Sequence, residues 1–211
     1  MNTGASIPQS HAHRKGGYTR RAVASDAADD PSSTRGRILS AAMDVLDRMG
    51  PAHIGIRAIA QKAKVSVGLV HLYFTSKDGL LEACVSQLYD ALLAVEGEQR
   101  ERLENDDLHE ALDHSVRRGY RIASENRVLV RVVMRFVAER GGLPGSLRES
   151  MQARYLDDWG AIVARRTGLE EWDARARVHS VTAMTGRYAA ASATELAAIL
   201  GEPDMDEPAL R

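Results

Sequence analysis

Residues 56–81 read IRAIAQKAKVSVGLVHLYFTSKDGLL and predict two short helices joined by a tight turn. Apolar residues recur every three or four positions in 56–63 and again in 67–74, as they do on one face of an α-helix. Ser66 precedes the second helix and Ser76 precedes a further one, and serine is a preferred N-cap. Two helices joined in this way form a helix-turn-helix, a unit whose second helix fits the major groove of DNA.

Cations surround this pair of helices where the phosphates of bound DNA would lie. Arg57 is near the start of the first helix, Lys62 and Lys64 flank the turn, and Lys77 opens the next helix. Lysine and arginine supply most of the affinity of proteins for the DNA backbone because they neutralise phosphate charge. The positions therefore predict backbone contacts on both sides of the turn.

The charge divides unevenly along the chain. Residues 34–81 hold seven cations and three anions, a net +4, and residues 1–33 hold four cations and three anions, a net +1. The whole chain has a net charge of −1, which leaves −6 for residues 82–211. A cationic N-terminal third followed by an anionic remainder indicates two parts with different partners, the first of which is nucleic acid.

Helical periodicity extends outward from this stretch in both directions. No segment shows the alternation of a strand, so the predicted fold class is all-α. The remaining predicted helices cover residues 34–49, 76–102, 108–124, 126–139, 146–166 and 172–200. The predicted organisation is a flexible, partly basic N-terminal arm over 1–33, a helix-turn-helix domain over 34–81, and a helical effector-binding and dimerisation domain over 82–211.

Composition excludes several classes of protein. The 211 residues contain one cysteine, Cys84, which excludes an internal disulfide framework and a cysteine-based zinc site. No metal site is predicted. The densest apolar run, 128–138, is interrupted by Arg131 and Arg135 and is too short to span a membrane. No apolar segment follows the basic residues of the N-terminus, so we expect no secretory signal and a cytoplasmic protein without membrane contact.

The complete string of residues 56–81 closely resembles the signature of TetR/AcrR-type transcriptional regulators. The resemblance rests on an Ile-Ala pair in the first helix, a Val-Ser turn, a glycine at the start of the recognition helix, an aromatic pair at its end and a lysine three residues later. It implies a three-helix domain joined by a long helix to an antiparallel helical domain that binds ligand and dimerises. The DNA-binding residues that it implies are Arg57, Ser66, Val67, Gly68, Leu69, His71, Leu72, Tyr73 and Lys77.

Two positions depart from the pattern of that family. The turn position that commonly holds glycine is Lys64, which would be strained by about 1–2 kcal/mol if its φ is positive. Lys64 could also add a phosphate contact. The first aromatic position of the recognition helix, commonly tyrosine, is His71, which leaves that phosphate contact open.

The second half offers a candidate effector pocket. Its predicted lining is Tyr120, Met134, Tyr155, Trp159 and Met184, although core packing explains each residue taken alone. Arg131 and Arg135 form either a cationic pocket or a solvated stripe completed by an Arg135–Glu139 pair. Asp158 either orients a cationic ligand or pairs with a nearby arginine.

These observations predict a homodimeric transcriptional regulator, most simply a repressor released from a palindromic operator by a small-molecule effector. Small residues crowd 183–193 and permit the close helix approach that a dimer interface requires. Two alternatives stay open, which are a DNA-binding protein without an effector and a small helical enzyme whose resemblance is accidental. The sequence has no nucleophile elbow, phosphate-binding glycine loop, zinc-protease motif or di-iron carboxylate set, and no cofactor is predicted.

Overall fold

The computed structural model describes residues 32–151 and 155–201, and every regular element in these ranges is a helix. The all-α prediction is thereby confirmed. The predicted N-terminal arm, including the basic stretch 11–21, lies outside the described residues except for its last two positions. The helices are α2 (Thr34–Met49), α3 (Ile56–Ala63), α4 (Val67–Tyr73), α5 (Lys77–Leu93), α6 (Glu96–Asn105), α7 (Leu108–Glu125), α8 (Arg127–Arg140), α9 (Gly145–Met151), α10 (Asp157–Thr167), α11 (Glu171–Ala190) and α12 (Ala193–Leu200).

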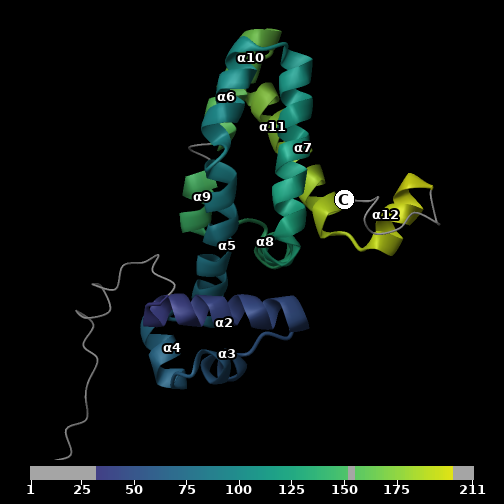
Figure 1. The fold of residues 1–211 in the computed structure, drawn as a ribbon. Helices are drawn as coiled ribbons and strands as arrows, with labels where there is room; N and C mark the ends of the chain where they lie inside the picture. The colour runs from purple at the N-terminus through teal and green to yellow at the C-terminus, as the bar shows by residue number, and fades with distance from the viewer. Residues whose placement is uncertain (1–31, 152–154, 202–211) are drawn as a thin grey trace, which may run out of the picture.

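Helices α2, α3 and α4 form one end of the molecule, and α5 leads away from them into a bundle of the remaining helices (Figure 1). Helices α6, α7, α10 and α11 make up the opposite end, while α12 projects sideways from the bundle (Figure 1). The α2–α4 end of the molecule is thus far from the end formed by α6, α7, α10 and α11.

The prediction of one helix over 76–102 is wrong, because the chain breaks after Leu93. Helix α5 ends there, and α6 begins at Glu96. The Val95 N–H donates to the Leu92 carbonyl at 3.4 Å, an i→i−3 bond that tightens the last turn. The apolar stripe also stops at Val95, and the next fully buried residue is Leu103. A continuous helix would gain little burial over this interval.

The last predicted helix, over 172–200, is also divided. Helix α11 ends at Ala190, and Ser192 caps the separate helix α12 by accepting a hydrogen bond from the Glu195 N–H at 3.1 Å. A serine N-cap followed three residues later by glutamate is a recognised start signal for a helix. Within the predicted 146–166 helix the structure describes α9 and α10, and residues 152–154 between them lie outside the described ranges.

Buried side chains form two clusters. The lower core is centred on α2–α5 and α8, and its fully buried members include Ile38, Leu46, Leu80, Leu81 and Cys84. The upper core joins α6, α7, α10 and α11 around Trp159 and Ile162. The predicted boundary at 81/82 cuts through α5 and through the lower core, so the described chain has no linker at this point.

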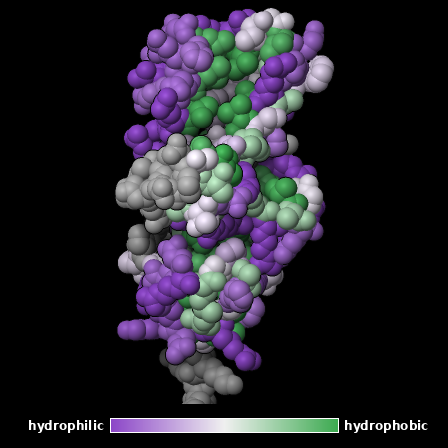
Figure 2. Space-filling view, turned by 90° about the vertical axis from the view of Figure 1, so that its right-hand side faces the viewer, coloured by the Kyte–Doolittle hydropathy of each residue, from purple (hydrophilic) through white to green (hydrophobic). Residues whose placement is uncertain are grey.

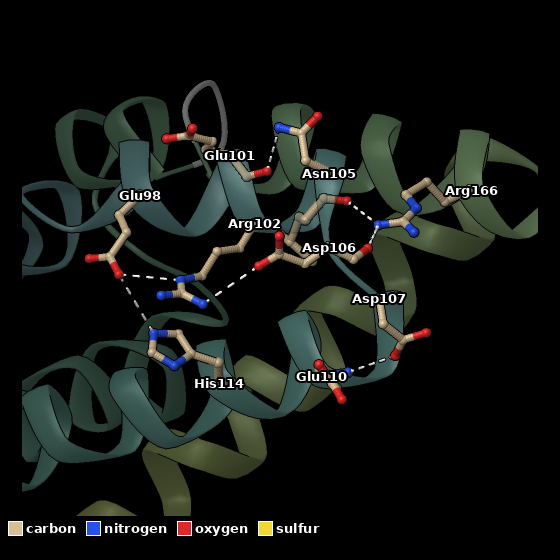
Figure 3. A network of polar contacts seen from close by, with 10 residues as sticks. Glu98, Glu101, Arg102, Asn105, Asp106, Asp107, Glu110, His114 and Arg166 are labelled. Atoms are coloured by element: carbon tan, nitrogen blue, oxygen red, sulfur yellow. Dashed lines mark hydrogen bonds and ion pairs between the residues drawn. The ribbon is translucent and has the colours of Figure 1, made fainter.

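The upper end is fastened by charged groups as well as by its core. Arg102 lies between Glu98 and Asp106, with nitrogen–oxygen distances of 3.3 and 3.5 Å (Figure 3). The Arg166 guanidinium donates to the carbonyl of Leu103 at 2.8 Å and to that of Asp106 at 2.7 Å (Figure 3). These carbonyls belong to the last turn of α6, where no intrahelical donor is available. Arg166 therefore terminates α6 from a helix 60 residues further along the chain.

Candidate nucleic-acid interface

Helices α3 and α4 are joined by a turn in which Lys64 has φ 55° and ψ 46°. Lys64 is the one non-glycine residue with positive φ among the residues that the structure describes. Its N–H donates to the Gln61 carbonyl at 3.2 Å, and the following Val65 N–H donates to Ala60 at 3.0 Å. The left-handed conformation lets both amides reach back to α3. The strain anticipated for a lysine at this position, about 1–2 kcal/mol, is therefore present.

Serine residues cap the N-termini of α4 and of α5, the helix that follows it. The Ser66 hydroxyl accepts from the Leu69 N–H at 3.1 Å and starts α4. The Ser76 hydroxyl accepts from the Gly79 N–H at 3.0 Å and starts α5. Such caps are worth about 1 kcal/mol each, which matters for a helix as short as α4. Both capping predictions are confirmed.

One face of α4 is committed to the core. Val70 is fully buried and Phe74 is 5% exposed, and Ile59 and Ala60 of α3 are buried against them. The Arg35 guanidinium lies 5.4 Å from the centre of the Phe74 ring, within cation–π distance. The packing side of the helix-turn-helix is therefore the side predicted from its apolar spacing.

The opposite face of α4 is open. Val67 and Leu72 are each 38% exposed, and Ser66, Gly68 and His71 are also exposed. Leu69 and Tyr73 are half-buried at the edges of this face. These side chains of α4 are therefore accessible to a partner.

No contact with the described residues requires a glycine at position 68. A Cβ built there would meet only the Ser66 hydroxyl, at 3.9 Å. Glycine within a helix costs about 0.5–1 kcal/mol relative to alanine, so the residue is unfavourable for folding alone. Its place on the open face is compatible with close approach of an external group to the backbone.

The cationic side chains of the helix-turn-helix differ in whether an acidic side chain already pairs with them. Arg57 and Lys64 are exposed and Lys77 is half-buried, and none of them forms an ion pair with another described residue. Lys62 instead pairs with Asp44 of α2 at 2.9 Å, and this contact holds the pKa of the Asp44 carboxyl below its usual value. Lys62 thus ties α3 to α2, whereas the sequence placed it among the phosphate-facing cations.

Arginines of α8 connect this unit to the bundle. Arg135 pairs with Glu139 at 2.8 Å, as its spacing predicted, and also donates to the Pro51 carbonyl at 2.8 Å. Pro51 lies in the loop between α2 and α3. The second contact joins positions 84 residues apart, so helical spacing carries no signal for it.

Two further α8 arginines extend the connection in opposite directions. Arg140 pairs with Asp78 and, at 3.7 Å, with Glu82, both in the first turns of α5. Arg131 donates to the Ala190 carbonyl at 3.1 Å, at the end of α11. The alternatives stated for Arg131 and Arg135 thus resolve into tethers: α8 touches the helix-turn-helix, the start of α5 and the end of α11.

The predicted effector pocket is not formed as one site. Tyr155 and Trp159 stack at 4.5 Å within the upper core, whereas Tyr120 packs against the lower core. Met134 is 38% exposed and Met184 is 49% exposed. These residues share helical stripes but lie in different cores or at the surface, and the effector pocket stays a prediction. Asp158 lies 3.9 Å from Arg100, which is the ion-pair alternative.

None of the described helices is both long and apolar enough to cross a membrane. Within the described ranges, no group of three or more histidine, cysteine, aspartate or glutamate side chains is placed to hold a metal ion.

The helix-turn-helix region of the chain is similar to known proteins. Residues 38–84 match the family described as bacterial regulatory proteins, tetR family. The HTH-type transcriptional regulator BetI of Ectopseudomonas mendocina (strain ymp) is 39% identical over 72 residues, which are 34% of this chain and 37% of that protein. The nicotine-responsive transcriptional repressor HdnoR of Paenarthrobacter nicotinovorans is 37% identical over 59 residues, 28% of this chain and 30% of its own length.

A second BetI, from Chromohalobacter salexigens, is 38% identical over 72 residues, 34% of this chain and 35% of that protein. The chain thus matches little more than a third of the length of these curated relatives. Residues 38–84, from α2 into the first half of α5, are therefore similar to a tetR-family helix-turn-helix domain.

Proposed function

We propose that this tetR-family chain is a homodimeric, sequence-specific DNA-binding regulator of transcription, and that it acts as a repressor released by a small-molecule effector. The observation that carries the proposal is α4, a short helix with one face buried and the other open, in a domain that matches the tetR family. Because such a protein works on the chromosome, we place it in the cytoplasm.

Recognition would use the open face of α4 in the major groove. The residues that we assign to DNA contact are Arg57, Ser66, Val67, Gly68, Leu69, His71, Leu72, Tyr73 and Lys77. Val67 and Leu72 are suited to contact base edges through apolar surface such as the thymine methyl group. Arg57, Lys64 and Lys77 would contact phosphate. We predict that Lys77→Ala weakens binding to all sequences alike, whereas Leu72→Ala changes which bases are preferred.

A second copy of the chain is the partner that we propose for α11 and α12. Val181 and Met184 of α11 are 48% and 49% exposed, and Ile199 and Leu200 of α12 are 48% and 57% exposed. The face of the molecule on which α12 lies exposes hydrophobic residues to solvent (Figure 2). A two-fold dimer would cover them and would place two α4 helices in successive major grooves about 34 Å apart.

Effector control would act through α5 and α8. Helix α5 starts inside the helix-turn-helix core, and the α8 arginines join that core to the end of α11. A ligand that moves either helix would change the separation of the paired recognition helices. The relative HdnoR is by its name responsive to nicotine, which supports small-molecule control in a protein with a similar segment.

Selection from a random oligonucleotide pool tests the proposal. We expect an inverted repeat whose half-sites are centred about one helical turn apart, bound by a dimer. Leu72→Ala should alter the selected half-site, while the matched control Val137→Ala, an exposed apolar residue of α8, should not. Absence of any preferred sequence would refute sequence-specific regulation, and a preferred site without symmetry would refute the dimer.

A further inference from the structure

Lysine is confined to the N-terminal part of the chain. Of the 28 lysine and arginine residues, four are lysines, and three of these, Lys62, Lys64 and Lys77, lie in the helix-turn-helix and at the start of α5. The fourth, Lys15, lies outside the described residues. Residues 82–211 contain 17 arginines and no lysine. The DNA-binding end and the bundle therefore differ in the chemistry of their cations as well as in net charge.

The two kinds of cation have different tasks in the structure. Arginines of the bundle act through the several donors of the guanidinium group: Arg166 donates to two carbonyls of α6, and Arg131 and Arg135 donate to carbonyls of distant segments. A guanidinium stays protonated in proteins, whereas a lysine amine that loses its proton is a nucleophile. Among the described residues, an amine-directed acyl donor would therefore modify only the DNA-binding end.

The three lysine amines differ in accessibility. Lys64 is exposed in the left-handed turn, with φ 55°, and forms no ion pair with a described residue. Lys77 is half-buried. The Lys62 amine lies 2.9 Å from the Asp44 carboxylate, so it can react only when that pair opens. The one thiol, Cys84, is fully buried and does not compete. Lys64 is thus the most accessible of these nucleophiles.

We propose that Lys64 is an acylation site, and that its reaction with acetyl phosphate or an acetyl thioester lowers DNA affinity. The lone pair of the deprotonated Lys64 Nζ attacks the acetyl carbonyl carbon and forms an N–C bond. The bond from that carbon to the phosphate oxygen or thioester sulfur breaks, the leaving group takes its electron pair, and the nitrogen loses a proton to solvent. The product is a neutral amide, so the side chain loses its charge.

The effect on DNA binding rests on the proposed function, in which Lys64 contacts phosphate. Residues 34–81 have a net charge of +4, and each lysine that becomes an amide lowers this charge by one. Each phosphate contact that is lost lowers the salt dependence of binding by about 0.9 unit. The fold should be unaffected by the Lys64 amide, because the two backbone hydrogen bonds of the turn remain and no ion pair with a described residue is broken.

The first experiment measures which lysine reacts, in the full chain without DNA. The protein is incubated in mildly alkaline buffer with acetyl phosphate or, in a parallel series, with acetyl coenzyme A, and peptide mass spectrometry follows each lysine over time. We expect Lys64 to react at least fivefold faster than Lys62, the matched control two residues away, because opening an exposed ion pair accounts for about fivefold. The faster donor identifies the source of the acetyl group. Equal rates at the two lysines, or no reaction of Lys64 with either donor, would overturn the proposal.

The second experiment compares the operator affinity of each protein before and after treatment. The wild type should lose about fivefold to tenfold in affinity for each Lys64 that is acetylated. Lys64→Arg carries a cation that the donor does not modify, so treatment should change its affinity far less. The matched control Lys62→Arg should lose as much as the wild type. Equal losses in Lys64→Arg and in the wild type would overturn the regulatory role of Lys64.

Two further measurements separate this role from unfolding and from failure of the proposed function. The melting temperature should be the same before and after acetylation of Lys64, and a lowered value that accompanies the lost affinity would assign the loss to unfolding and overturn the role. Bound operator should slow acetylation of Lys64 more than that of Lys62, and equal protection would also overturn it. A protein that binds no preferred DNA would refute the proposed function instead, and the reaction rates without DNA would still decide the site.

Discussion

The two ends of the molecule are stabilised in different ways. At the α2–α4 end, short helices with serine caps pack on one side only and are tied to the bundle by Arg135 and Arg140 of α8. At the α6–α10 end, longer helices enclose Trp159 and Ile162 and are fastened by ion pairs and by Arg166.

The difference shows how the fold can leave one face of α4 exposed to solvent. Helix α4 can leave Val67 and Leu72 uncovered because its other side packs into a core that continues through α5 and α8. The orientation of the helix-turn-helix then depends on contacts with distant parts of the chain. Among the described residues, the upper end makes no comparable contacts with α2–α4, so substitutions in the two regions should separate stability from DNA binding.

The largest effects should come from removing one aromatic ring at each end. We expect Phe74→Ala and Trp159→Ala each to lower the free energy of unfolding by about 3–5 kcal/mol, since both side chains are buried. Phe74→Ala should also abolish DNA binding, while the folded fraction of Trp159→Ala should still bind. Denaturant titration with operator-binding assays checks this. Operator binding by Phe74→Ala equal to that of the wild type would contradict the comparison.

The tether of α8 should have an intermediate effect. Arg135→Ala removes the ion pair with Glu139 and leaves the Pro51 carbonyl without its donor, so we expect a loss of about 1–3 kcal/mol. Arg117→Ala is the matched control, because Arg117 has an i,i+4 pair with Asp113 at 2.7 Å and is exposed. Its loss should be at most about 0.5 kcal/mol. Equal losses in thermal unfolding would show that the Pro51 contact contributes nothing.

The strained turn offers a smaller gain. Lys64→Gly should raise stability by about 0.5–1 kcal/mol, because relief of the left-handed strain exceeds the added entropy of the unfolded chain. Lys64→Ala removes the same charge but keeps the backbone strain, so this variant should be no more stable than the wild type. Both variants should reduce the salt dependence of DNA binding by about one unit per protomer if Lys64 contacts phosphate. An unchanged salt dependence in both would remove Lys64 from the interface.

The smallest stability change should come from two helical glycines. Gly68→Ala and Gly119→Ala should each gain about 0.5 kcal/mol, since neither Cβ would meet an atom closer than 3.9 Å. Gly68→Ala should nevertheless weaken operator binding, while Gly119→Ala, in α7, should leave it unchanged. Calorimetry and DNA titration of the two proteins provide the comparison. Unaltered operator affinity in Gly68→Ala would mean that DNA does not approach this backbone closely.

Local signals explain why the helix-turn-helix could be predicted from the sequence. Ser66 and Ser76 act on amides three residues away, and Val70 and Phe74 reveal the buried face by their spacing. The all-α fold class was predicted from the same three- and four-residue spacing of apolar side chains. These features depend on neighbours in the sequence, so no tertiary information was needed.

The rest could not be predicted because it depends on distant partners. Helical spacing grouped Tyr120 with Tyr155 and Trp159, but the first belongs to the lower core and the others to the upper. The Arg135–Pro51 contact spans 84 residues. The break at Ser192 did carry a local signal, the glutamate three residues later, which the small-residue stripe obscured.

The single thiol of the chain stands at the junction of the two parts. Cys84 is fully buried in α5, and burial raises its pKa to about 12. Only a thiolate reacts with electrophiles, so at neutral pH the native protein presents almost no reactive sulfur. Alkylation or oxidation must wait for the lower core to open, and its rate then reports how often that opening occurs. The reaction rate of Cys84 therefore measures the opening of this junction without a label attached anywhere else in the molecule.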